Sequence, residues 1–290
     1  MKVAARILSI SFVFLCSTML VFALAQAGDP EPSEGFFVAY GSWLVRLATL
    51  DLGTSSRLLP GAPVAEVAAQ GIALSLGLAA GGLSFSTLVS LAFAWVASRR
   101  TGGLGPGGAV LLLVSAMPVV VIAYLARDLL NPAIAALAER GVIASPRPYL
   151  IGIGAGWFQY AIAAVTLGLG DAFLAHLALT LKDECARVRS SDYVLAAELN
   201  GGPVAAHMAR NLFVPTLSTL SARLPALLGG VVVVETAYSL NGAGRVLWRA
   251  TIEGDMAVLL AVTVMLTAVV VVLRLVAEVL SLVFDPRLRR

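Results

Sequence analysis

The feature that most constrains this chain is a series of long apolar runs without charged residues. The longest, from Val67 to Ser98, contains no Asp, Glu, Lys or Arg. A helix needs about 20 mostly apolar residues to cross the hydrocarbon core of a bilayer, so this run is long enough to span a membrane. Five similar stretches, some interrupted by one or two charges, complete the series. The pattern predicts six transmembrane helices, at residues 7–26, 70–97, 109–126, 158–181, 212–235 and 256–281.

Composition agrees with a membrane protein. Hydrophobic residues make up 59% of the chain and charged residues 13%, whereas a soluble domain carries about 25% charged residues. This balance excludes an ordinary cytosolic enzyme, a disordered chain and a nucleic-acid-binding domain. The apolar runs are continuous rather than alternating, which argues against a membrane barrel. We therefore expect an all-α, polytopic membrane protein. Cys16 and Cys185 lie in an apolar and a charged stretch respectively, so neither a disulfide nor a metal site is expected.

The distribution of basic residues predicts the orientation. With both termini in the cytoplasm, Arg99, Arg100 and the arginines at 287–290 fall on the cytoplasmic side, as the positive-inside rule requires. The N-terminus has a second interpretation, because Lys2, Arg6, an apolar run and a small-residue site at 23–25 or 25–27 also resemble a cleavable signal peptide. The apolar run is longer than a usual signal core. A retained transmembrane helix is therefore expected.

The stretches between the spans suggest how the chain is organised. Residues 1–69 are expected to hold the first helix and the longest external loop, and residues 70–290 a core domain with five helices. Phe36–Leu50, in that loop, is weakly amphipathic and is expected to lie on the membrane surface. The external loop 127–149 is expected to carry a short helix at 131–140. The polar segment 182–211, on the cytoplasmic side, is expected to form two short helices separated at Gly201-Gly202-Pro203.

One cytoplasmic stretch carries a recognisable motif. Residues 192–201 read DYVLAAELNG, and residues 207–215 read HMARNLFVP. This resembles the coupling loop of ABC-importer permeases of the dipeptide/oligopeptide/nickel branch, in which D-Y-V, E-A-A, three residues and G precede H-A-L-R-N and an apolar-Pro ending. Further matches to that branch are LLGGVVVVET at 227–236, NGAGR at 241–245, FDPR at 284–287, GDP at 28–30 and DLG at 51–53. The resemblance covers nearly the whole chain and is strongest over its C-terminal third.

The resemblance implies a type I ABC importer permease in a bacterial cytoplasmic (inner) membrane. Such a subunit has no ATP site, cofactor or catalytic residue of its own, and no Walker motif occurs in the sequence. Its implied partners are a second homologous permease, two ATP-binding subunits, an extracytoplasmic substrate-binding protein and the lipid bilayer, without nucleic acid. The implied substrates are short peptides, with nickel complexes or other small solutes as alternatives. The implied coupling residues are Asp192, Tyr193, Ala196, Ala197 and Gly201.

The coupling segment also has a physical logic of its own. Small residues at Ala196, Ala197 and Gly201 would let a short helix settle into a groove on a partner, and Gly201 can adopt the positive φ that a turn requires. Asp192 is expected to cap the first helix. The segment departs from the family pattern in two ways: Leu195 stands where the first E of E-A-A is expected, and the stretch after Gly201 is about one helical turn shorter.

Three polar residues lie within predicted spans and are assigned to the translocation path: Asp171, His176 and Arg223. Asp171 and Arg223 are expected near mid-bilayer, about 15 Å from the ends of their spans. A lone charge there costs at least about 2.5–3.5 kcal/mol by insertion scales. We therefore hypothesise that Asp171 and Arg223 form an ion pair that lines or braces the path. The alternative is that they face separate watery cavities or a partner permease.

A second group of residues is predicted at the outer mouth of the path: Glu235, Gly242 and Gly244. Glu235 is expected near the outer end of the fifth span, where its carboxylate could accept hydrogen bonds from backbone amides of the Asn241–Arg245 turn. Glycines at 77, 81–82 and 229–230 are expected to let helices approach closely, and the alternative is that they line the path.

Two other classes of protein remain as alternatives. A secondary transporter would need no ATPase, would carry ion-linked residues and would usually have more spans. A membrane scaffold would not transport at all. Co-purification with an ATPase in mild detergent would separate these alternatives from an importer permease.

Overall fold

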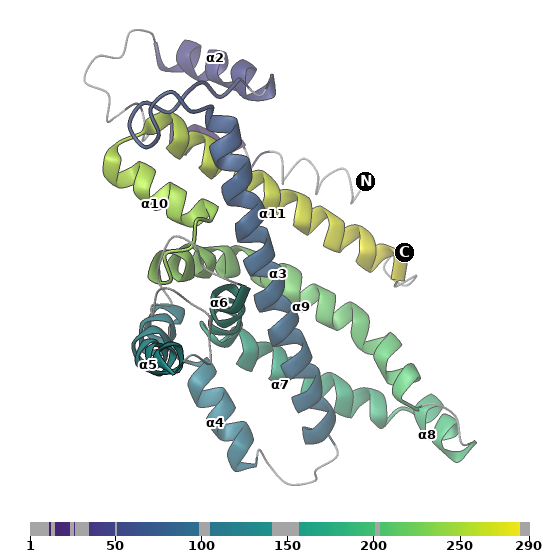
Figure 1. Cartoon of the computed structure of the whole chain (residues 1–290). Helices are drawn as coiled ribbons and strands as arrows, with labels where there is room; N and C mark the ends of the chain where they lie inside the picture. The colour runs from purple at the N-terminus through teal and green to yellow at the C-terminus, as the bar shows by residue number, and fades with distance from the viewer. Residues whose placement is uncertain are drawn as a thin grey trace. The chain divides into compact units, whose positions relative to one another are not determined.

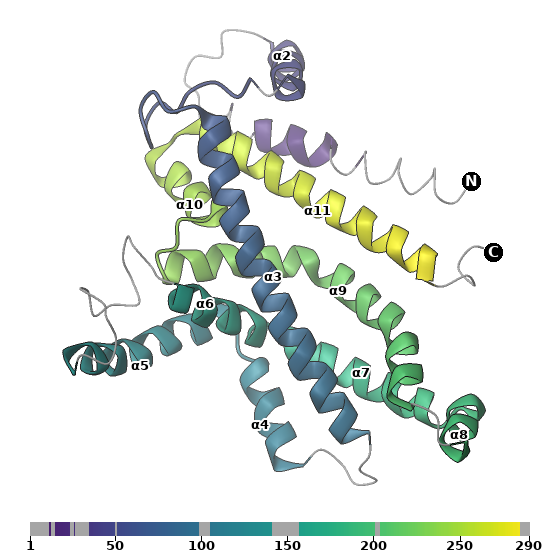
Figure 2. The same cartoon turned by 45° about the vertical axis from the view of Figure 1, so that its right-hand side comes forward.

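The computed structural model describes residues 12, 15–23, 26, 35–49, 51–98, 105–140, 157–200 and 204–284. Within these ranges the chain is helical, and its one extended pairing is an isolated bridge between Thr54 and Pro63. Figure 1 shows the helices and Figure 2 shows them from a second direction. They are α2 (Phe36–Ala48), α3 (Val64–Ala97), α4 (Pro106–Ser115), α5 (Val119–Glu139), α6 (Trp157–Leu169), α7 (Phe173–Arg189), α8 (Asp192–Leu199), α9 (Val204–Ala237), α10 (Ala243–Glu253) and α11 (Met256–Phe284).

The chain forms two compact units. The first comprises Met1–Leu76 and Asn241–Leu273, and the second comprises Gly77–Leu240 and Arg274–Arg290. Residues 241–273 thus group with the N-terminal part of the chain. The division into a domain at 1–69 and another at 70–290 stays a prediction.

The core of the second unit forms around α9, which packs against α5, α6 and α7. Tyr238, just after α9, is fully buried in this core. Its hydroxyl lies 3.0 Å from the Thr166 hydroxyl, and its carbonyl accepts a 2.7 Å hydrogen bond from the Gln159 side chain. These two bonds hold the end of α9 against α6. Pro215 and Pro225 lie inside α9, and because proline removes a backbone hydrogen bond, they explain the curvature of this helix in Figure 2.

The core of the first unit joins the start of α3 to α10 and α11. Val64, Ala68, Ala243, Ala250 and Val258 are buried together there. Small residues make this contact close. A Cβ on Gly71 would lie 3.0 Å from the backbone of Ala243, whose amide donates a 2.8 Å hydrogen bond to the Ser75 hydroxyl.

The same unit contains a buried carboxylate at the junction of α10 and α11. Asp255 is fully buried, and its Oδ2 accepts hydrogen bonds from the Ser55 hydroxyl (2.7 Å) and from the amides of the next three residues, Ser56, Arg57 and Leu58 (3.0, 2.9 and 3.1 Å). Its Oδ1 accepts from the Val258 amide at 3.3 Å. Asp255 therefore ties the loop before α3 to the start of α11.

The helices support part of the predicted membrane topology. Among the described residues, three helices are long and apolar enough to cross a membrane: Val64–Ala97, Asn211–Ala237 and Met256–Ala277. The number rises to five if each of two bent helix pairs counts as one span. The expected six spans are thus not reached within this part of the chain, and most of the first predicted span, 7–26, lies outside the described residues.

Two predicted spans are broken rather than continuous. The span expected at 109–126 is divided into α4 and α5, which bend by 105°. Pro118 lies at this break and cannot continue the hydrogen bonding of α4. The span expected at 158–181 is divided into α6 and α7, with a bend of 61°. In addition, α5 continues to Glu139, so the helix expected at 131–140 is the end of a longer helix.

The segment 182–211 also differs from the expected pair of isolated short helices. Its first residues continue α7 as far as Arg189, α8 follows at Asp192–Leu199, and its last residues open the long helix α9 at Val204. The predicted short helix at the motif is therefore present as α8. Gly201-Gly202-Pro203, the predicted break, lies outside the described residues.

Candidate functional site

The helix that carries the coupling motif, α8, is held by a buried side chain. Val194 is 1% exposed and packs in a cluster with Cys185 and Leu181 of α7 and Met208 of α9. Ala94, near the end of α3, belongs to the same cluster, and the Arg189 guanidinium lies 5.6 Å from the centre of the Trp95 ring. The ends of α3 and α7 and the start of α9 therefore form a platform that fixes α8.

The opposite side of α8 faces away from this platform. Asp192, Ala196 and Leu199 are exposed, and their spacing of three and four residues places them on one helical face. Leu199 is 79% exposed. Tyr193 and Ala197 are also residues of α8, whereas Gly201 lies outside the described residues. We call Asp192, Ala196 and Leu199 the α8 face.

Asp192 does not occupy the cap position that we expected. The helix α8 already includes Asp192, and Ser191 precedes it. A carboxylate in the first turn still interacts favourably with the positive end of the helix dipole. Asp192 thus supports the start of α8 from within the helix.

The break between α4 and α5 and the break between α6 and α7 are joined by hydrogen bonds. The amides of Asp171 and Ala172, which follow α6, donate hydrogen bonds to the carbonyls of Met117 (3.1 Å) and Ser115 (2.6 Å), at the end of α4. In return, the Ser115 hydroxyl accepts from the Ala175 amide in the first turn of α7 at 2.8 Å. Helix ends leave such backbone groups without intrahelical partners. Backbone amides at the α6–α7 break thus find hydrogen-bond acceptors at the end of α4, and the carbonyls there find donors.

Asp171 has a specific part in this arrangement. Its Oδ1 accepts a 2.9 Å hydrogen bond from the amide of Val119, the first residue of α5. An acidic side chain at a helix N-terminus accepts a hydrogen bond from a backbone amide that has no partner within the helix. Its negative charge also interacts favourably with the positive end of the helix dipole. Asp171 and Ala172 have φ values of 54° and 55°, a left-handed conformation that Asp tolerates better than most residues. Asp171 is therefore the cap of a helix that is distant in sequence.

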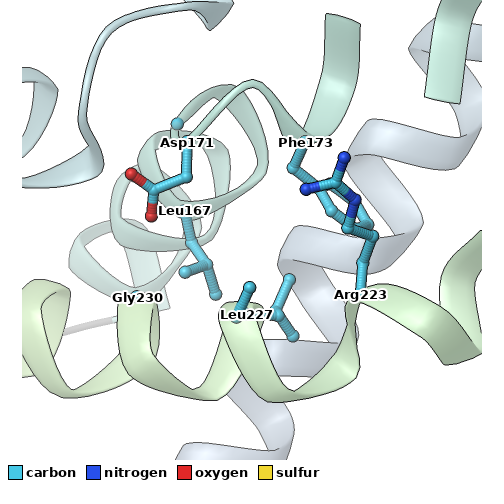
Figure 3. Close-up of a pocket in the computed structure, with 8 residues that line it drawn as sticks. Leu167, Asp171, Phe173, Arg223, Leu227 and Gly230 are labelled. Carbon is cyan, nitrogen blue, oxygen red and sulfur yellow. The ribbon is translucent and has the colours of Figure 1, made fainter. Parts of the chain in front are cut away.

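A small pocket lies beside these breaks (Figure 3). Its lining residues come from α6, from the break between α6 and α7, from the first residue of α7 and from α9: Leu167, Gly170, Asp171, Phe173, Arg223, Ala226, Leu227 and Gly230. Leucine, phenylalanine and glycine make most of the wall apolar. The two charged side chains, Asp171 and Arg223, are the exception, and both were predicted to line the path.

The predicted ion pair between Asp171 and Arg223 is not formed. Figure 3 shows the Asp171 carboxylate turned away from the Arg223 guanidinium, and no ion pair joins these two described residues. Instead, the Oδ1 of Asp171 accepts the hydrogen bond from the Val119 amide. The structure thus brings the two charges to one pocket but not into contact. His176 is exposed on α7 and is not among the residues that line the pocket.

The capping role predicts different effects for two substitutions at Asp171. Asp171→Asn keeps an oxygen for the Val119 amide and also tolerates positive φ, so we expect transport and thermal stability close to those of the wild type. Asp171→Ala leaves the amide without a partner and should cost about 1–2 kcal/mol of stability. Thermal unfolding in detergent and transport in proteoliposomes measure both. An equally severe loss in Asp171→Asn would show that the negative charge itself is needed.

The residues predicted at the outer mouth fall in different surroundings. Glu235 is 1% exposed near the end of α9. Gly242 is the residue before α10 and has an extended backbone, and Gly244 is buried in the first turn of that helix. The expected hydrogen bonds from the Asn241–Arg245 turn to Glu235 stay a prediction. No group of three or more His, Cys, Asp or Glu that could hold a metal occurs among the described residues.

Comparison with known proteins defines the class of this chain. Residues 108–290 match the family described as the binding-protein-dependent transport system inner membrane component, and the chain belongs to this family. It is 26% identical to a protein named as a peptide transport system permease in Brucella abortus, over 87% of this chain and 80% of the relative.

Two further relatives carry related names. The dipeptide transport system permease protein DppB of Lactococcus lactis is 26% identical over 86% of this chain and 80% of its own length. The oligopeptide transport system permease protein OppB of Escherichia coli is 29% identical over 47% of each chain. The resemblance expected from the motifs is thereby confirmed, and the chain is an ABC-importer permease.

Sequence reasoning missed two features of the site. The exposure of Leu199 could have been suspected from its spacing with Asp192 and Ala196, but a leucine is usually assigned to a core. The capping of α5 by Asp171 left no local signal, because the two residues that bond, Val119 and Asp171, are 52 positions apart.

Proposed function

We propose that this chain is one of two permease subunits of an ATP-driven importer for short peptides in a bacterial inner membrane. The observation that carries the proposal is α8, which is fixed on one side by Val194 and presents Asp192, Ala196 and Leu199 on the other. A helix held and exposed in this way is suited to transmit force from a separate protein. The proposed partner at this face is an ATP-binding subunit, one of two in the complex.

The proposed coupling runs through α9. This helix begins beside α8 and includes Arg223, Leu227 and Gly230 of the pocket. At about 1.5 Å per residue, the path along α9 from Val204 to Arg223 is about 30 Å long. A displacement of α8 driven by closure of the ATP-binding subunits would therefore reach the pocket along one continuous helix. We assign the pocket, with Asp171 and Arg223, to the translocation path.

The remaining partners follow from the proposed orientation. Both termini and α8 lie in the cytoplasm, which places Arg187 and Arg189 of α7 on the side that the positive-inside rule requires. Glu235, Gly242 and Gly244 then lie toward the opposite side, where an extracytoplasmic binding protein would deliver substrate. A second, homologous permease would complete the path.

The names of the relatives support the substrate class. The DppB and OppB relatives are named for dipeptide and oligopeptide transport. Uptake of labelled di-, tri- and pentapeptides by proteoliposomes that contain the complete importer tests this directly. We expect ATP-dependent uptake of at least one length class. Uptake of a nickel complex instead of peptides would contradict the proposed substrate class. Uptake driven by an ion gradient without ATP would identify a secondary transporter.

The α8 face leads to a prediction with a matched control. Ala196 on α8 and Ala186 on α7 are both exposed helical alanines. Ala196→Asp places a charge in the proposed ATPase contact, so we expect at least tenfold less ATP-binding subunit to co-purify in mild detergent, equivalent to about 1.4 kcal/mol of binding free energy. Ala186→Asp adds the same charge to the neighbouring helix and should leave co-purification unchanged.

A second substitution at the same face checks the role of the exposed leucine. Leu199→Ala removes an apolar side chain that lies outside the cluster beneath α8, so the fold should be retained and ATP-binding subunit should be lost. Normal co-purification of both Ala196→Asp and Leu199→Ala would place the coupling contact elsewhere. If the variants retain the ATP-binding subunit normally but do not transport, the substitutions affect a step after the ATP-binding subunit has bound.

A further inference from the structure

The short helix α2 has surfaces that its own unit does not explain. It comprises 13 residues, FFVAYGSWLVRLA, and contains one charge, Arg46. About 20 residues are needed to cross a bilayer, so α2 cannot span one. A helix this apolar is nevertheless poorly suited to full exposure in water. Its three sides differ in their chemistry and show where it lies.

The first side is fixed against neighbouring helices of the same unit. The Phe22 ring packs on the rings of Phe36, Tyr40 and Trp43 of α2, with centroid distances of 5.8, 5.5 and 5.5 Å. The Tyr40 hydroxyl lies 2.9 Å from that of Thr18, and Leu260 of α11 belongs to the same cluster. These contacts set the rotation of α2 about its axis, so the other two sides have defined directions.

The second side is apolar and uncovered. Phe37, Val38 and Val45 are 74%, 64% and 65% exposed. At 100° per residue, the three side chains fall within an arc of about 100° that faces away from the aromatic cluster. The third side is a polar edge beside this arc, formed by Ser42 and Arg46, which are both exposed and one helical turn apart. An apolar arc next to a basic edge is typical of helices that lie in a membrane interface.

We propose that α2 lies along the membrane–water interface, with Phe37, Val38 and Val45 among the lipid acyl chains and Arg46 at the phosphate groups. The occupant of the apolar arc is thus the lipid bilayer. Three observations favour lipid over a protein partner: the helix is anchored to neighbouring helices of its own unit, the chain belongs to a family of membrane components, and a long basic side chain at the edge can extend to headgroups while its stem stays apolar. The proposal does not depend on which substrate is transported.

Spin labels at matched positions on α2 test this placement. Cys16 is exposed and is replaced by serine, whereas Cys185 is buried and can be retained. Labels are attached to Val45→Cys on the apolar arc and to Ser42→Cys on the polar edge of the complete importer. The importer is placed in vesicles of phosphatidylethanolamine and phosphatidylglycerol. Accessibility is then measured with oxygen, which concentrates in the acyl region, and with a water-soluble nickel chelate.

We expect the Val45→Cys label to collide more often with oxygen and the Ser42→Cys label more often with the nickel chelate. Preferential nickel accessibility at both positions would show that α2 stands in water and would overturn the proposal. Protection of the Val45→Cys label from both reagents would show that a protein covers the arc, which also overturns it. Because transport is measured separately on the same vesicles, failure of the importer and failure of the interfacial placement are distinguishable.

Discussion

Asp255→Ala should detach the loop before α3 from the α10–α11 junction and destabilise the first unit by at least about 3 kcal/mol. The substitution removes a buried acceptor of five hydrogen bonds, from the Ser55 hydroxyl and four backbone amides. A buried donor without its partner costs about 1–3 kcal/mol, although the exposed amides can recover part of this from water. The effect is large because one carboxylate serves so many donors.

Limited proteolysis measures this effect locally. Arg57 is an exposed trypsin site within the loop that Asp255 holds. Cleavage requires the loop to open, so its rate follows the local opening equilibrium. We expect cleavage after Arg57 to be at least tenfold faster in Asp255→Ala. The control is Glu253→Ala, which removes a partly exposed ion pair with Arg249; such pairs contribute about 0–1 kcal/mol. Equal cleavage rates in the two variants would show that Asp255 does not hold the loop before α3 in place.

The same carboxylate predicts a pH dependence. Burial alone would raise the pKa of Asp255, but hydrogen bonds from Ser55 and from the amides of Arg57, Leu58 and Val258 outweigh burial and lower the pKa from 3.8 to about 2. The ionised form is thus favoured in the folded state. Its stabilising contribution, about 2 kcal/mol, is fully present above about pH 5 and is lost as the pH falls toward 2. Asp255→Asn should be less stable at pH 7 and should lose less stability between pH 5 and pH 2.

Gly168→Ala should be one of the two most damaging single-methyl changes at the described glycines of the second unit, together with Gly170→Ala. A Cβ at this position would lie 2.7 Å from the Ser86 Oγ, 2.8 Å from the Gly82 carbonyl oxygen and 2.9 Å from the Phe85 ring. The Ser86 hydroxyl also donates to the Gly168 carbonyl at 2.7 Å, so the two helices cannot separate without losing this bond. Overpacking typically costs about 1–3 kcal/mol, and the backbone atom in this contact favours the upper part of that range.

Gly229→Ala is the matched control, because a Cβ at this position would meet no described atom within 4 Å. Alanine is favoured over glycine in a helix by up to about 1 kcal/mol, so this variant should be as stable as the wild type or slightly more stable. Cys185 serves as the reporter, because it is buried in the second unit and a thiol-reactive dye labels it only on unfolding. Heating the Cys16→Ser background with the dye should give a clearly lower midpoint for Gly168→Ala alone. Equal midpoints for the two alanine variants would show that the α3–α6 contact can relax.

The interpretation of glycines from sequence was only partly correct. Gly81, Gly82 and Gly230 were expected at close helix contacts, and a Cβ on each would lie 3.0 Å from a neighbouring atom. The expectation was wrong for Gly77 and Gly229, where a Cβ would have no neighbour within 4 Å in the part of the chain that the structure describes. Meanwhile Gly168 and Gly170, which have the closest contacts, were not selected. A glycine in an apolar run has the same local sequence whether it faces lipid or another helix.

The sequence by itself determined the class of protein and the location of the coupling helix. Uncharged runs longer than a bilayer is thick allow few other folds, and the motif at 192–201 identified the helix that became α8. These features are local, because hydropathy and a short motif are read from consecutive residues. They can therefore be predicted without knowing which helices are neighbours.

Only the tertiary structure decided how the predicted spans are interrupted and what their charged residues do. A hydropathy average over some 20 residues does not register a break of three residues, so the spans at 109–126 and 158–181 were each predicted without an interruption. Asp171 bonds to Val119 across 52 positions, and Asp255 to Ser55 across 200. Both carboxylates satisfy backbone amides rather than opposite charges. A sequence shows which residues are charged. It does not show which backbone amides, far away in the sequence, will lack a hydrogen-bond partner in the fold, and those amides determined where the two carboxylates bond.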